Sequence, residues 1–116
     1  MTAQTGPDSA GIVIVVPAPC CSFTAPGGGQ LELYGFGTFV ERLAERFTVI
    51  RYDKPGCGLA DGDGVDLSFD GQVAAALAVA DTVGAGRFGR FGASQGGQLA
   101  AAIAARYPDR VDALVL

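Results

Sequence analysis

The chain has 116 residues, of which 49% are hydrophobic and 17% charged, and this balance excludes an intrinsically disordered protein. Its net charge of −4 argues against nucleic acid or a membrane surface as a partner. Histidine is absent from the whole sequence, which removes the usual general base for a serine nucleophile and the commonest zinc ligand. We expect neither a metal site nor a bound cofactor.

The first ten residues are polar and carry neither the basic residues nor the apolar run of a signal peptide. We interpret residues 1–10 as a flexible lead-in to one domain over residues 11–116. The three cysteines, Cys20, Cys21 and Cys57, are odd in number and lack a regular spacing, which argues against a disulfide framework. We instead expect the cysteines to be buried as free thiols and the protein to be cytoplasmic, in a reducing compartment.

The elements that follow alternate between strands and helices. Residues 12–16 form a continuous β-branched run that is typical of a central strand in a parallel sheet, and Pro17 ends it. Ser68 is placed to cap a helix that runs to about Thr82. The remaining segments are a helix at about 36–46, strands at 47–52, 87–91 and 111–116, and a helix at 95–106. This order predicts a three-layer α/β fold, with helices on both faces of a parallel sheet.

The segment Gly92-Ala93-Ser94-Gln95-Gly96-Gly97 matches the pattern G-x-S-x-G between the last predicted strand-helix pair. In that context the pattern predicts a nucleophile elbow, in which a sharp turn holds Ser94 at the carboxyl edge of the sheet. Gly92 and Gly96 flank the serine where larger side chains would collide. The alternative is a Ser-Gly turn of another α/β domain. Asp53, Asp61, Asp63 and Asp66 lie in neighbouring turns, where solvent-facing roles are expected.

These residues make the chain similar to the first half of the α/β-hydrolase fold family. The strand at 12–16, the turn Asp53-Lys54-Pro55-Gly56-Cys57-Gly58 and the segment 92–97 carry the resemblance, in the family's order. The resemblance implies strands in the spatial order 47–52, 12–16, 87–91, 111–116. It also implies that the triad acid and histidine follow the serine, after the last residue present here, so we interpret the chain as a truncated form of the fold.

The resemblance further implies an oxyanion hole made of two backbone N–H groups. Gln95, the residue after the serine, supplies one. The family usually has His-Gly after its first central strand, and Pro17-Ala18 stand here instead. Counting onward places Pro19, which has no N–H, at the second donor position. Either the N–H of Ala18 or that of Cys20 takes this role, or Gln95 is the only donor.

Two functions agree with these features. The first is an α/β-hydrolase-type serine hydrolase that acts on an ester or similar small acyl substrate, inactive as this chain alone. The second is a non-catalytic hydrolase-like domain for ligand sensing or scaffolding, similar to domains of bacterial signalling proteins, which Pro17 and the missing histidine favour. We also expect the apolar strand at 111–116 to form an exposed sheet edge that promotes self-association.

Overall fold

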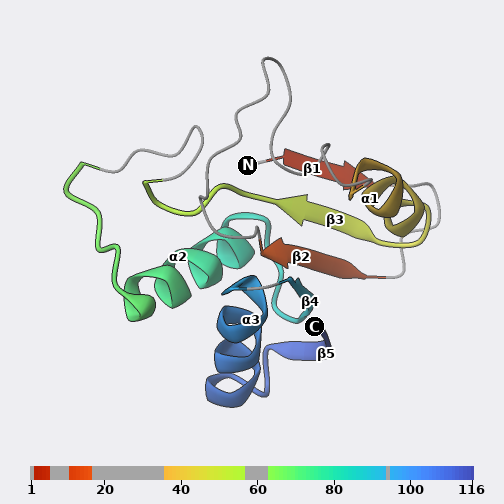
Figure 1. Ribbon diagram of the computed structural model, residues 1–116. Helices are drawn as coiled ribbons and strands as arrows, with labels where there is room; N and C mark the ends of the chain where they lie inside the picture. The colour runs from red at the N-terminus through yellow and green to blue at the C-terminus, as the bar shows by residue number, and fades with distance from the viewer. Residues whose placement is uncertain (1, 6–10, 17–35, 57–62, 94) are drawn as a thin grey trace.

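The computed structural model describes residues 2–5, 11–16, 36–56, 63–93 and 95–116, and in these the strands form one sheet. Figure 1 shows the strand order β1-β3-β2-β4-β5. The strands are β1 (Thr2–Thr5), β2 (Ile12–Val16), β3 (Thr48–Arg51), β4 (Phe88–Gly92) and β5 (Val111–Val115). All pairs among β3, β2, β4 and β5 are parallel. The predicted order of these four strands is therefore confirmed, with β2 inside the sheet.

The strand β1 corrects the interpretation of a flexible lead-in at residues 2–5, whereas residues 1 and 6–10 lie outside the described residues. Thr2–Thr5 pair antiparallel with β3, from Thr2 opposite Arg51 to Thr5 opposite Thr48. The sequence here is polar and has no apolar alternation that would predict a strand. Pairing satisfies the backbone N–H and C=O groups along the edge of β3, which any residue except proline can do. This is a requirement of the assembled sheet and not of the local sequence.

The helices agree closely with the sequence expectations. They are α1 (Phe36–Ala44), α2 (Phe69–Thr82) and α3 (Gln95–Arg106), so α1 ends two residues earlier than predicted. The Ser68 hydroxyl caps α2 by accepting a hydrogen bond of 3.1 Å from the Gly71 N–H. Gly84 follows α2 with φ of 71°, a left-handed conformation that glycine adopts readily and that ends helices.

The helices cover both faces of the sheet, which confirms the three-layer architecture. On one face α2 and α3 enclose the larger core, whose buried residues include Ile50, Phe88, Leu99 and Ile103. On the other face α1 packs through Val40 onto Val49. The neighbours Val49 and Ile50 point to opposite faces, as the twofold period of a strand requires. Figure 1 shows α2 and α3 together and α1 apart from them.

The strand β5 forms one edge of the described sheet. The residues of β5 are exposed from Asp112 onward, and Leu116, which follows the strand, is 71% exposed. Leu114 and Val115 are also exposed. An apolar edge of this kind favours pairing with another strand. Among the described residues, no helix is both long and apolar enough to cross a membrane.

Candidate active site

The turn between β4 and α3 connects a buried strand end directly to a helix start. Gly92 ends β4 and is buried, and α3 begins at Gln95. The Gly96 N–H donates a hydrogen bond of 2.9 Å to the carbonyl of Ala93, which closes the turn. Ser94 lies outside the described residues, so its hydroxyl is not placed. The residues on both sides of it nevertheless define a tight strand-to-helix connection at this position.

Gly92 is required by the close approach of the helix to the strand. A Cβ atom on Gly92 would stand 2.6 Å from the carbonyl carbon of Gly96 and 2.8 Å from the nitrogen of Gly97, and closer still to the Gly96 carbonyl oxygen. These are backbone atoms, which cannot move aside as a flexible side chain can. The sequence argument that Gly92 must be small is thus supported by its close contact with the backbone of Gly96.

The first turn of α3 offers backbone N–H groups at the carboxyl edge of the sheet. The side chain of Gln95, the first helical residue, is exposed, and Gly96 behind it is buried. N–H groups in the first turn of a helix have no acceptor within the helix, and the helix dipole adds a partial positive charge there. The backbone N–H of Gln95 can therefore donate a hydrogen bond to an anion. Ala18, Pro17, Pro19 and Cys20 lie outside the described residues, so the second donor is not placed.

Three strand ends meet beside this turn. Val16 of β2 is the register partner of Gly92, and Phe91 is the partner of Val115 in β5. The side chain of Leu116 reaches the turn as well, since its Cδ2 would lie 3.6 Å from a Cβ on Gly97. The turn is therefore bordered by β2 on one side and by the exposed end of β5 on the other.

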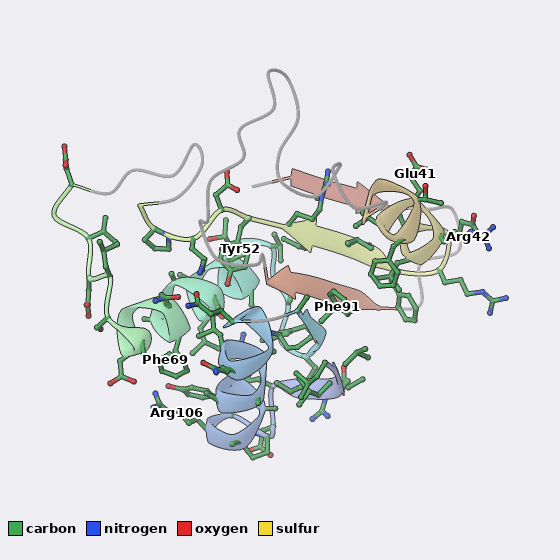
Figure 2. The ribbon with its side chains drawn as sticks, in the orientation of Figure 1. Glu41, Arg42, Tyr52, Phe69, Phe91 and Arg106 are labelled. Carbon is green, nitrogen blue, oxygen red and sulfur yellow. The ribbon has the colours of Figure 1, made fainter. Side chains whose placement is uncertain are left out.

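Beneath the same edge lies a buried polar pair that the sequence analysis did not single out. Arg90 of β4 is 1% exposed, and Tyr52, directly after β3, is 7% exposed. Figure 2 shows Tyr52 between the end of β3 and the helices α2 and α3. The signal was available in the alternation of β4, because Phe88 and Arg90 lie two residues apart and so share a face of the sheet.

Arg90 and Tyr52 influence each other electrostatically. Burial raises the pKa of the Tyr52 hydroxyl, and the positive charge of Arg90 opposes that rise. Burial lowers the pKa of the Arg90 guanidinium, and the Tyr52 hydroxyl opposes that change. The pair nevertheless does not complete a hydrogen bond of good geometry, and the three guanidinium nitrogens have no acceptor among the described residues.

Comparisons with known proteins agree with this architecture. A profile of the alpha/beta hydrolase fold matches residues 25–116, which is most of the chain. The chain belongs to this family. The matched range includes the turn at 92–97.

Solved structures of hydrolytic enzymes superpose on nearly the whole chain. A variant of the meta-cleavage product hydrolase CumD, from Pseudomonas fluorescens IP01, is 26% identical with a TM-score of 0.79 and matches 99% of this chain. A probable hydrolytic enzyme from Pseudomonas aeruginosa PAO1 is 24% identical (TM-score 0.75, 98% of this chain). The enol-lactonase of Burkholderia xenovorans LB400 is 23% identical (TM-score 0.74, 97% of this chain). The chain spans 39%, 34% and 40% of these proteins, respectively.

The structure describes three of the four aspartates that the sequence analysis placed in the neighbouring turns. Asp66 accepts a hydrogen bond of 2.9 Å from the Ser68 N–H, and hydrogen bonds from Ser68 lower the pKa of its carboxyl group. Asp53 and Asp63 are exposed, whereas Lys54 is only 8% exposed. Asp61 and the three cysteines lie outside the described residues. Within the described ranges no group of three potential ligands is arranged to hold a metal ion.

A shallow hollow of about 610 Å³ lies elsewhere, between the outer sides of α2 and α3. Its apolar floor includes Val73 and Leu77, and Asp70 and Arg106 pair across one end at 2.6 Å. Figure 2 shows Arg106 beside Phe69, whose ring centroid is 5.9 Å from the guanidinium carbon. None of the described residues of the turn 92–97 lines this hollow. It is therefore separate from the candidate active site.

Proposed function

We propose that the chain is the nucleophile-bearing part of an α/β-hydrolase-type serine hydrolase that acts on an ester or similar small acyl substrate. Ser94 is the proposed nucleophile. The observation that carries this proposal is the turn in which Gly92 meets Gly96, with a strand end before Ser94 and a helix start directly after it. That combination exposes a serine at a sheet edge in this family.

In the proposed reaction, the Ser94 hydroxyl attacks the substrate carbonyl carbon, and the carbonyl oxygen becomes an oxyanion. Collapse of this intermediate breaks the ester C–O bond, the alcohol leaves with a proton, and water then releases the acid from the acylated Ser94. The Gln95 N–H, at the positive end of α3, would donate to that oxygen, with Ala18 as the proposed second donor. A general base must take the serine proton, and no histidine is present in the 116 residues to do so. We propose that the base and the triad acid come from outside these residues.

The missing base gives a specific expectation for the 116-residue chain. Loss of a triad member typically costs several orders of magnitude in rate. We therefore expect no turnover of an activated ester above the buffer rate, but slow stoichiometric acylation of one serine. The measurement is intact mass spectrometry after incubation with p-nitrophenyl acetate, followed by peptide mapping. Acylation at Ser94 that is absent in Ser94→Ala supports the nucleophile.

A matched control distinguishes this result from general serine reactivity. Ser68 is exposed, but it caps α2 through its hydroxyl and has no proposed chemistry. Ser68→Ala should therefore acylate at the wild-type rate. Equal labelling of Ser94 and Ser68, or labelling that persists in Ser94→Ala, would contradict the assignment. A chimaera that joins this chain to the acid- and histidine-bearing remainder of a hydrolase should then turn over ester only with Ser94 present.

The alternative is a non-catalytic hydrolase-like domain. Pro17 and the absence of histidine favour it, because the first removes the usual loop residue and the second removes the base. This alternative predicts no acylation of Ser94 by any activated ester and no turnover by the chimaera. The two experiments therefore separate the two functions.

A further inference from the structure

The buried guanidinium of Arg90 is the feature that the proposed hydrolase function leaves unexplained. Three other described arginines form ion pairs at exposed or partly exposed positions: Arg87 with Asp112, Arg106 with Asp70, and Arg110 with Asp81. Arg90 is 1% exposed, and none of its three nitrogens has a hydrogen-bond acceptor among the described residues. A buried charge without a partner is strongly unfavourable, so Arg90 requires a compensating group.

The described surroundings of Arg90 compensate its charge only in part. The guanidinium carbon lies 5.7 Å from the ring centroid of Phe88, a cation–π distance. The guanidinium carbon of Arg110 lies 5.6 Å from the same ring centroid, so the Phe88 ring interacts with two cations. The Tyr52 hydroxyl is buried and also lacks a hydrogen-bond partner among the described residues. Arg90 and Tyr52 lie close enough to interact electrostatically, so two buried groups with unused donors share one region near the carboxyl edge of the sheet.

We infer that Arg90 and Tyr52 form a receptor for the carboxylate group of a small organic acid. A guanidinium donates two parallel hydrogen bonds to a planar carboxylate, and the tyrosine hydroxyl can donate a third. A single negative charge matches the single positive charge of Arg90. A phosphate would bring a second charge into an apolar core, which costs additional desolvation.

The proposed carboxylate receptor lies close to the candidate active site. Its binding of a carboxylate does not require that Ser94 is a nucleophile. Arg90 precedes Gly92 by two residues in β4, and Tyr52 follows the end of the parallel strand β3. Both therefore lie near the sheet edge that carries the turn at 92–97. Because the guanidinium nitrogens are covered, a ligand must displace neighbouring side chains to reach them, and we expect millimolar affinity.

The test is thermal unfolding of the 116-residue chain at pH 7, with acetate replacing chloride at constant ionic strength. We expect a saturable rise in Tm with acetate. At about ten times the dissociation constant, the ratio of folded to unfolded protein should rise roughly elevenfold. Saturation-transfer NMR with acetate measures the same binding on the folded protein, and phosphate at equal ionic strength is the comparison anion.

Variants assign the effect to the pair. Arg90→Leu should abolish the saturable acetate response, and Tyr52→Phe should weaken it severalfold. Arg42→Leu is the matched control, because Arg42 is exposed on α1, away from Tyr52 (Figure 2), and it should respond as wild type. Arg90→Lys keeps the charge without the planar fork, and we expect at least tenfold weaker binding. This variant and Tyr52→Phe decide the matter if Arg90→Leu fails to fold.

Three results would overturn the inference. The first is an acetate response of equal size in Arg90→Lys or Arg90→Leu, which would show a general salt effect. The second is the absence of any saturable response in the wild type, which would show that Arg90 is compensated within the chain itself. The third is an equal or larger response to phosphate, which would exclude a carboxylate-specific receptor. Acylation of Ser94 does not affect any of these outcomes, so the proposed function is tested separately.

Discussion

Replacement of Gly92 by alanine should be among the most damaging single-methyl changes in this protein. The new Cβ would lie 2.6 Å from the carbonyl carbon of Gly96, whereas ordinary van der Waals contact begins at 3.4 Å. The strand end and the helix start would have to separate by at least about 0.8 Å, the difference between these two distances, and by more to clear the closer carbonyl oxygen of Gly96. Only backbone surrounds the site, so no rotamer change can relieve the clash. Overpacking costs about 1–3 kcal/mol, and we expect the upper end here.

Gly97→Ala is the matched control for this prediction. Its new Cβ would meet the Gly92 carbonyl oxygen at 3.4 Å and Leu116 at 3.6 Å, which are ordinary contacts. Alanine is also a better helix former than glycine. The free energy of unfolding of this variant should therefore equal that of the wild type or exceed it by up to about 1 kcal/mol.

Urea unfolding followed by circular dichroism measures both changes. With an m-value of about 1.5 kcal/mol/M, a loss of about 3 kcal/mol lowers the midpoint by about 2 M. The reasoning would be refuted if Gly92→Ala unfolded within about 0.5 kcal/mol of the wild type. It would be equally refuted if Gly97→Ala were the more damaging change.

Four further predictions follow from the described contacts. Ser68→Ala removes the α2 cap and should lower the free energy of unfolding by about 1 kcal/mol in urea titrations, whereas Ser68→Asp should retain most of it. Hydrogen bonds from Ser68 lower the pKa of the Asp66 carboxyl group. The ionised carboxylate therefore contributes to the stability of the folded state at pH values above its ordinary pKa of 3.8, and this contribution is lost as the pH falls through the folded-state pKa. The stability difference between wild type and Asp66→Asn should therefore narrow between pH 6 and pH 2, and a constant difference would show that the carboxylate charge plays no part. Arg90→Met should raise the free energy of unfolding by roughly 1–4 kcal/mol in carboxylate-free buffer, and a loss instead would reveal a partner for the charge. Val115→Lys, at the exposed edge strand β5, should reduce concentration-dependent association in analytical ultracentrifugation, a prediction that fails if the wild type is already monomeric at high concentration.

The features that the sequence determined by itself are those governed by local rules. The boundaries of α3 and the start of α2 after its Ser68 cap follow from capping residues and helical periodicity. The parallel order of β3, β2, β4 and β5 follows from the alternation of strands and helices together with the family resemblance. The candidate site was also local, because the turn at 92–97 is defined by six consecutive residues whose glycines meet each other.

Other features were decided only by residues distant in the sequence. Thr2–Thr5 became a strand because β3 offered an unpaired edge some 45 residues further along the chain, and nothing in its own polar sequence predicts this. Similarly, the register of β4 placed Arg90 on the same face as Phe88, and the packing of α2 and α3 over that face then enclosed the charge. Local propensity cannot report such pairings, because each depends on which surface the rest of the fold leaves available. The tertiary structure therefore determined the antiparallel edge strand and the buried Arg90–Tyr52 pair.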